Sequence, residues 1–237
     1  MNNFWIDTLP PGYYDKILEK GIKEKKGIQP NWHHSTFTYV SKYIDSDDIH
    51  LDYACGPGSF VGKYLETTSI GVDISHDQIK YASNKYKEKG NFVALDHFNY
   101  KDYEKYFNKI TVIGLFEFIK NDEILDLLNK LYFMLSDEGT ILLTTPNYRS
   151  AMPILESLVN KLSSINYENQ HINKFNENKL IDILSKSKFN NIKVYKILNF
   201  GVFFGYFGLK VSEKIQNLIK KITFGNFGYL LLGVLKK

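Results

Sequence analysis

The sequence predicts an α/β fold built on a mostly parallel sheet. Short apolar runs alternate along the chain with amphipathic segments, which is typical of repeated strand–helix–strand units. The chain has 237 residues, of which 43% are apolar and 24% charged, so it can bury a substantial core. These values exclude a disordered or collagen-like chain.

Seven apolar runs predict the strands, at residues 49–54, 69–73, 91–95, 110–115, 140–144, 192–198 and 229–235. Helices are expected over residues 59–66, 122–135 and 176–187, the last two with apolar side chains at helical spacing. Ser75 is expected to cap a further helix, with Gln78 three residues later as in a capping box. Gly139 is expected to stop the helix over 122–135.

Three longer segments lie outside this alternation, at residues 1–44, 146–175 and 199–228. Helices are expected in them over 33–44, near 153–162, and around the apolar positions 211, 215, 218, 219 and 222. Such segments usually carry specificity in open α/β proteins. We therefore expect one domain over residues 1–237, with 1–44 as an N-terminal helical cap and the other two segments as inserted caps.

The composition indicates where the protein is located in the cell and which ligands it is not expected to bind. The longest apolar runs are about ten residues, whereas a membrane-spanning helix needs roughly 20. The start of the chain lacks the pattern of an export signal, so a cytoplasmic protein is expected. Cys55 is the only cysteine, which argues against internal disulfides and a cysteine-based zinc site, and no metal is expected. The net charge of +4 is mild, so no nucleic-acid partner is expected.

The most informative stretch is LDYACGPGSF, residues 51–60. A strand ends there, and the Gly-x-Gly turn from Gly56 to Gly58 begins a helix whose free N–H groups can meet a ligand. Asp73 ends the second strand, where a carboxylate can bind ribose hydroxyls. Asp96 follows the third strand, where it can accept a hydrogen bond from an adenine amino group.

These residues favour an adenosine without a pyrophosphate. A nicotinamide dinucleotide fingerprint needs a third glycine where this chain has Val61, and no Walker loop follows. Asp52, just before the turn, suits a ligand with an ammonium group and repels phosphate.

The motifs DYACGPGSF, GVDIS, IGLFEFI and LYFMLSDEGTILLTTPN resemble the successive motifs of class I S-adenosylmethionine (SAM)-dependent methyltransferases. The resemblance covers about residues 45–198. It implies a Rossmann-like sheet of seven strands with helices on both faces and the last strand antiparallel. It also implies SAM as cofactor and S-adenosylhomocysteine (SAH) as product. Residues 45–145 would form the SAM-binding half, and residues 146–237 the substrate-side half.

The cofactor-binding residues that the resemblance implies are Asp52, Ala54, Cys55, Gly56, Gly58, Asp73, Ile74, Asp96, His97, Leu115 and Phe116. The two glycines would line the methionine part of SAM, and Asp73 would bind the ribose. Asp96 would hydrogen-bond the adenine, which Ile74 and His97 would flank. The backbone at positions 115 and 116 would face the methionine and the sulfonium.

The outer segments resemble narrower groups. The stretch PPGYYDKILEKGIKEKKGIQPNWHHSTF resembles the start of bacterial methyltransferases that modify polysaccharides and lipids. QHINKF and SKFNNIKVYKI resemble O-methyltransferases of the ubiquinone-pathway type, although Lys188 stands where glycine is usual. A small-molecule, sugar or lipid-linked acceptor, methylated on a hydroxyl oxygen, is therefore expected, and a quinone or lipid methyltransferase is the alternative.

A hydroxyl acceptor benefits from a general base. His171 ranks first, because its segment follows the fifth strand, and Glu117 ranks second, just past the fourth. His171 as a surface or packing histidine is an equal alternative. Arg149, the only arginine, and His33 are candidates for binding the acceptor. A surface arginine and a histidine packed beside Trp32 are the simpler explanations of these two.

Other functions are weighed against this one. A non-catalytic SAM-binding protein is disfavoured by the intact glycines and carboxylates, and nucleic-acid methylation by the sequence LFEF at 115–118, which lacks a D/N-P-P-Y/F loop. The segment 199–228 combines Phe and Gly with flanking lysines. Peripheral membrane contact and a homodimer contact are considered for it, and internal packing of its apolar face is favoured.

Overall fold

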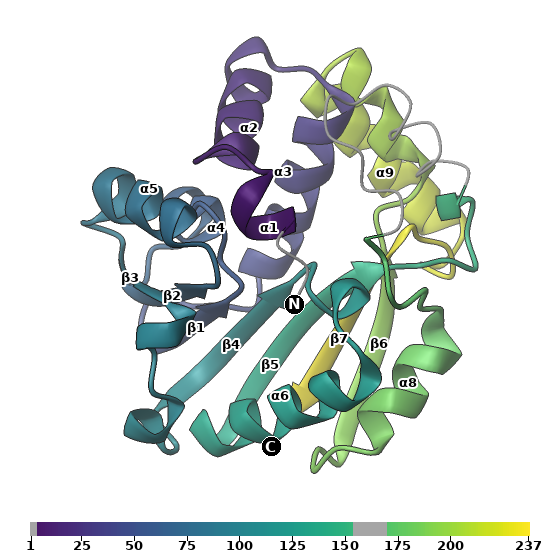
Figure 1. Ribbon diagram of the computed structural model, residues 1–237. Coiled ribbons are helices and arrows are strands. Elements are labelled where there is room, and N and C mark those ends of the chain that lie inside the picture. The colour runs from purple at the N-terminus through teal and green to yellow at the C-terminus, as the bar shows by residue number, and fades with distance from the viewer. Residues whose placement is uncertain (1–3, 154–169) are drawn as a thin grey trace.

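The computed structural model describes residues 4–153 and 170–237. Its centre is a seven-stranded sheet in the order β3-β2-β1-β4-β5-β7-β6 (Figure 1). The strands are β1 (His50–Tyr53), β2 (Ser69–Asp73), β3 (Gly90–Ala94), β4 (Phe107–Ile113), β5 (Leu135–Pro146), β6 (Asn191–Ile197) and β7 (Leu230–Lys236). β7 runs antiparallel to both neighbours and the other strands pair in parallel, which confirms the predicted fold class.

Two apolar layers cover the faces of the sheet, because successive side chains of a strand point to opposite sides. In β5, Ile141 and Leu143 join the layer under two helices, and Leu142 joins the layer on the other side. The first layer lies under α6 (Asn121–Met134) and α8 (Glu177–Ser185). The second lies under α3 (Ile28–Ser41), α4 (Ser59–Tyr64) and α5 (His76–Tyr86).

Two elements begin five residues earlier than predicted. The helix predicted over 122–135 is α6, but the strand predicted over 140–144 begins at Leu135, directly after α6, so Gly139 does not stop the helix. The helix predicted over 33–44 begins earlier, at Ile28. Pro30 lies in its first turn, where the N–H that proline lacks has no partner in the helix anyway. The helix predicted near 153–162 falls largely outside the described residues.

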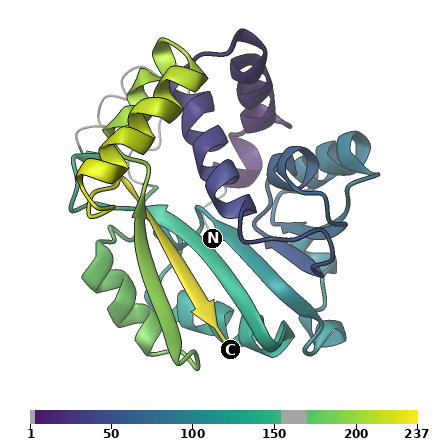
Figure 2. The same ribbon diagram turned by 180° about the vertical axis from the view of Figure 1, so that it is seen from behind.

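A helical cap lies above the carboxyl edge of the parallel strands (Figure 1). It combines α1 (Phe4–Asp7), α2 (Tyr13–Glu24) and α3 with α9 (Leu209–Ile222), which is inserted between β6 and β7. Both views show α3 beside α9 (Figure 2). The buried Asn31 amide joins them, since it donates to the Val202 carbonyl at 2.6 Å and to the Ser212 hydroxyl at 2.7 Å. Sequence-distant segments therefore form one layer.

The apolar face of α9 was expected to pack internally, but part of it faces outward. Ser212 faces the protein and is buried, but the apolar side chains of Val211, Leu218 and Ile222 are exposed. Among the described residues, no helix is both long enough and apolar enough to cross a membrane.

The buried carboxylate of Asp15 holds the cap against the cofactor half of the fold. It accepts hydrogen bonds from Ser59 of α4 at 2.8 Å and from Tyr81, Lys85 and Tyr86 of α5 at 2.9, 2.6 and 2.7 Å. Burial alone would raise the pKa of Asp15, but these donors outweigh burial and hold it below the ordinary value of 3.8.

Replacement of Asp15 by Ala should lower the free energy of unfolding by roughly 2–4 kcal/mol, because Lys85 and the hydroxyls of Tyr81 and the buried Tyr86 lose a charged partner. The folded-state pKa is depressed, so this stabilisation is present above pH 3.8 and is lost as the pH falls through the folded pKa. Urea unfolding at pH 7 measures the loss. Asp182→Ala, which breaks only an exposed pair with Lys186, is the matched control and should cost under about 1 kcal/mol.

Candidate functional site

The glycine turn after β1 is fixed to the tip of β2. The amides of Ala54 and Cys55 both donate to the Val72 carbonyl, at 2.7 and 3.0 Å. Ala54, Gly56 and Gly58 have positive φ angles of 66°, 52° and 73°. Such angles are costly for most side chains, so the Gly-x-Gly spacing is what allows the chain to reverse here.

The two glycines differ in what surrounds them. A Cβ added to Gly56 would meet no atom within 4 Å, so this part of the turn faces open space. A Cβ added to Gly58 would lie 2.7 Å from the Phe92 ring and 3.0 Å from Ala82. Gly58 therefore permits α4 to pack closely, whereas Gly56 leaves its backbone accessible to a ligand.

Asp73 connects the tip of β2 to this turn. Its Oδ2 accepts from the Gly56 amide at 2.8 Å, and its Oδ1 accepts from the Ser75 amide at 2.9 Å. Ser75 in turn caps α5, as predicted, by accepting from the Gln78 amide. The Gln78 side chain does not return to Ser75 as in a capping box, because its Oε1 accepts from the Gly12 amide at 2.9 Å. Burial raises the pKa of Asp73 against the opposing effect of these backbone donors. The carboxylate is thus held rigidly, with lone pairs left for further donors.

Asp52 is buried beneath the turn. Thr111, its partner in the β1–β4 register, donates to its Oδ1 at 2.7 Å. The Thr111 hydroxyl has one proton, which it donates to Asp52. Its oxygen therefore accepts a hydrogen bond from Nε2–H of the His50 ring, 2.9 Å away. Burial raises the pKa of Asp52 to about 7, with the Asp73 charge adding to the shift. A cation near Asp52 would restore its charged form.

Asp96 and His97 lie on the exposed 3-10 turn Leu95–His97 after β3. His76, from the start of α5, donates to Asp96 Oδ2 at 3.0 Å, and its ring meets His97 edge to face at 5.5 Å. Ile74 is half-buried next to Asp73. The tips of β2 and β3 therefore bring together the residues expected around an adenine, and His76 adds a contact that the sequence analysis did not single out.

Glu117 lies past β4, in the turn Phe116–Phe118. Its carboxylate is buried and accepts from the Thr145 hydroxyl at 2.9 Å. Burial raises the pKa of Glu117 to about 7, so it is poised to exchange a proton near neutral pH. Leu115 is half-buried before it, whereas the Phe116 side chain belongs to the core.

His171 is held beside the same turn. The amides of Ile172 and Asn173 donate to the Glu117 carbonyl, at 2.8 and 3.0 Å. The His171 ring stacks on Phe118 at 5.0 Å, and its Nδ1 lies 2.8 Å from the Tyr148 hydroxyl. The segment after β5 thus brings His171 to the end of β4.

Two further aromatic residues complete this corner. Trp5 of α1 also contacts Phe118, with the two ring centroids 4.5 Å apart. Tyr148 is fixed by its amide, which donates to the Phe175 carbonyl at 2.7 Å. The sequence analysis identified neither residue. Trp5 lies far from Phe118 in the chain, and Tyr148 stands beside Arg149, whose charge made Arg149 the candidate in LTTPNYR. The cap and the strand tips share this corner.

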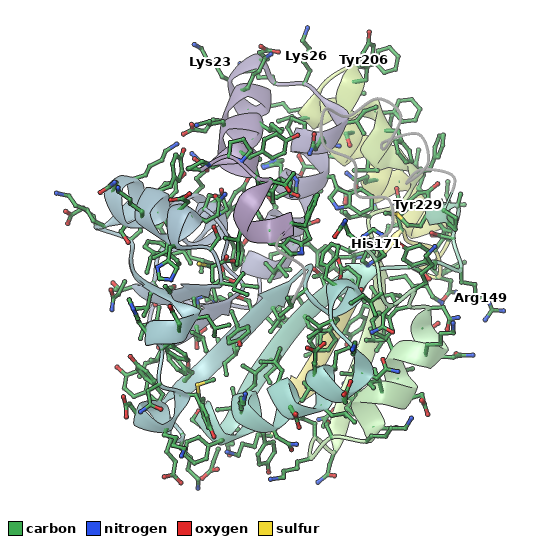
Figure 3. The ribbon with its side chains drawn as sticks, in the orientation of Figure 1. Lys23, Lys26, Arg149, His171, Tyr206 and Tyr229 are labelled. Atoms are coloured by element: carbon green, nitrogen blue, oxygen red, sulfur yellow. The ribbon has the colours of Figure 1, made fainter. Side chains whose placement is uncertain are left out.

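Two candidates lie apart from it. The Arg149 side chain is exposed and points outward, away from His171 (Figure 3). His33 packs in the cap against the Tyr14 ring at 5.3 Å and Phe37 at 6.0 Å. Burial lowers the pKa of His33 to about 4, so it is neutral at physiological pH. Over residues 4–153 and 170–237, no cluster of three His, Cys, Asp or Glu side chains is placed to hold a metal ion.

Comparison with known proteins places this geometry in a family. The family model of a methyltransferase domain matches residues 30–194. The tRNA (guanine-N(7)-)-methyltransferase of Clostridium botulinum strain 657 is 28% identical over 110 residues, which are 45% of each chain. The matched region thus spans less than half the length of this curated relative.

Solved structures agree on the fold. A SAM-dependent methyltransferase from Archaeoglobus fulgidus covers 95% of this chain and all of its own, with 21% identity and a TM-score of 0.59. The plantazolicin methyltransferase BpumL, solved in complex with SAH, covers 99% of this chain and 93% of its own, with 19% identity and a TM-score of 0.61. The chain therefore belongs to the methyltransferase domain family and has the fold of the class I SAM-dependent methyltransferases.

Proposed function

We propose that this chain transfers a methyl group from SAM to a hydroxyl oxygen of a small-molecule or glycan acceptor. The observation that carries the proposal is the rigid tip of β2, where Asp73 is fixed to the amide of an otherwise open Gly56. This arrangement fits a nucleoside whose amino acid tail needs backbone contacts in place of phosphate-binding lysines.

Different residues would bind the different parts of SAM. Asp73 would hold the ribose hydroxyls and Asp96 the adenine amino group, with Ile74 and His97 beside the ring. Gly56 and the backbone at 115 and 116 would line the methionine part. Asp52 would take its charged form when an ammonium group lies nearby, since burial alone keeps its pKa near 7. Ala54, Cys55 and Gly58 would shape the turn.

The acceptor side depends on a proton acceptor and on exclusion of water. SAM supplies a methyl group already activated by its sulfonium. His171 is the first candidate for the general base, because its Nδ1 lies 2.8 Å from the Tyr148 hydroxyl, which orients the ring. Glu117 is the second candidate, because its pKa near 7 lets it exchange a proton at neutral pH. Trp5 and Phe118 would shield this corner from water.

Methylation of tRNA is the second candidate function. The Clostridium botulinum relatives carry that name, and they match 45% of this chain. The single arginine supports a small acceptor instead, because arginine makes the commonest specific contacts to bases and bidentate contacts to phosphates. Incubation with methyl-labelled SAM, a panel of hydroxylated small molecules and glycans, and total tRNA separates the two. Label confined to tRNA would overturn the proposed acceptor class.

Asp73→Ala should weaken SAH binding at least about tenfold, because hydrogen bonds to a charged group contribute roughly 1.5–3 kcal/mol. Titration calorimetry with SAH measures the change. Asp77→Ala, an exposed neighbour in the first turn of α5, is the control and should bind like the wild type. Equal affinity of Asp73→Ala and the wild type would show that the ligand does not use this carboxylate.

Asp52→Asn should flatten the pH dependence of SAH binding. The wild type should bind SAH more tightly as the pH rises through about 7, since an ammonium ligand pairs only with the ionised carboxylate. The same variant should be more stable than the wild type at pH 8 without ligand. In the wild type, the folded-state pKa of Asp52 is raised from 3.8 to about 7. The protonated carboxyl therefore stabilises the fold fully below pH 3.8, and this stabilisation is lost as the pH rises through about 7.

Thermal unfolding of Asp52→Asn and the wild type at pH 5 and pH 8 provides the readout, taken as the difference between the two proteins at each pH. A difference that is the same at both pH values would contradict a buried, titrating Asp52.

His171→Ala should lower the rate of methyl transfer from labelled SAM to the acceptor by about 10²–10⁴-fold, the usual range for a general base, with SAH affinity nearly unchanged. Tyr148→Phe should cause a smaller loss, because it removes only the partner of Nδ1. The matched comparison is Glu117→Gln. Should Glu117→Gln abolish turnover and its dependence on pH near 7 while His171→Ala stays active, Glu117 and not His171 is the base.

A further inference from the structure

The outer end of the cap exposes large apolar side chains. Phe224, Phe207 and Ile222 are 88%, 73% and 68% exposed, and Val211 and Leu218 lie between them on α9. Positions 211, 218 and 222 are seven and four residues apart, so they form one stripe along the helix. Contiguous exposed apolar surface of this kind marks an interaction site.

Lysines border this stripe. Lys210, Lys214 and Lys221 fall along one side of it, by their helical spacing. The loop after α2 adds more lysines, because it is hydrogen-bonded to the start of α9. The Gly27 amide donates to the Gly205 carbonyl at 2.7 Å, and the Leu209 amide donates to the Lys25 carbonyl at 2.9 Å. Figure 3 accordingly shows Lys23, Lys26 and Tyr206 at one end of the molecule.

We name this region the basic apolar tip. Its members, all exposed, are Lys23, Glu24, Lys25, Lys26, Tyr206, Phe207, Lys210, Val211, Lys214, Leu218, Lys221, Ile222 and Phe224. Six lysines against one glutamate give it a charge of +5, more than the +4 of the whole chain. Beside Phe224, Lys220 and Lys221 line a shallow hollow of about 460 Å³, into which an anionic group can fit.

We propose that the basic apolar tip docks on the surface of an anionic lipid bilayer. An amphipathic helix with a lysine border lies in the interface with its apolar face among the acyl chains and its ammonium groups at the lipid phosphates. The exposed aliphatic side chains of Leu218 and Ile222 suit acyl chains, and the tip contains no arginine, the residue that nucleic-acid sites favour. A two-fold contact between copies would bring the same lysines face to face.

Docking does not require the proposed methyl transfer, and it would hold the cap and the strand tips beside membrane-bound compounds. Sedimentation with vesicles of phosphatidylcholine, alone or with 30% phosphatidylglycerol, tests it on the full chain. We expect the protein to sediment with the anionic vesicles, to be released by about 0.5 M salt, and to bind neutral vesicles at least about tenfold more weakly.

Two paired variants test the surface. Phe207→Ser with Ile222→Ser, and Lys214→Glu with Lys221→Glu, should each reduce vesicle binding about tenfold or more. Ile181→Ser on α8 and Lys80→Glu with Lys101→Glu, all exposed and outside the tip, are the matched controls and should bind like the wild type. Unchanged SAH binding and thermal unfolding in every variant separate a lost surface from a lost fold or cofactor site.

Three results would overturn the proposal. The first is a wild-type protein that sediments with neither vesicle. The second is vesicle binding that survives both paired variants. The third is a failure to bind vesicles together with a dimer, or a complex with RNA, that the tip variants abolish.

Discussion

The hydrogen bonds from the Gly56 and Ser75 amides to Asp73 are the constraint on which the site depends. They fix three things at once: the end of β2, the reversal after β1 and the beginning of α5. A carboxylate held by backbone donors needs no side-chain reorganisation when a ligand arrives, so its position is set by the fold. The polar chain from His50 through Thr111 to Asp52 supports the turn from below.

The cap completes the corner where an acceptor would meet the cofactor. Asp15 anchors α2 to α4 and α5, and Asn31 anchors α3 to the segment before β7. The same layer carries Trp5 against Phe118 on its inner side and the basic apolar tip on its outer side. The buried hydrogen-bond clusters around Asp15 and Asn31 thus join segments from both ends of the chain into one rigid layer.

The sheet could be predicted from the sequence because its strands are short apolar runs whose order the glycine and carboxylate motifs mark. The starts of two elements were less predictable. Pro30 obscured the start of α3, and α6 passes into β5 without a breaker, so the sequence pattern placed the starts of α3 and β5 too late. Contacts across the chain, such as Trp5 with Phe118 or Tyr148 with His171, depend on tertiary geometry that local pattern does not encode. The exposed stripe of α9 looked like a core face for the same reason.

A crystal structure of the protein with SAH bound at pH 8 would show where each part of the cofactor lies. We expect the ribose hydroxyls on Asp73, the adenine beside Asp96, and the amino acid tail along Gly56 with its ammonium group toward Asp52. SAH bound elsewhere, or with its ribose away from the tip of β2, would contradict this expectation.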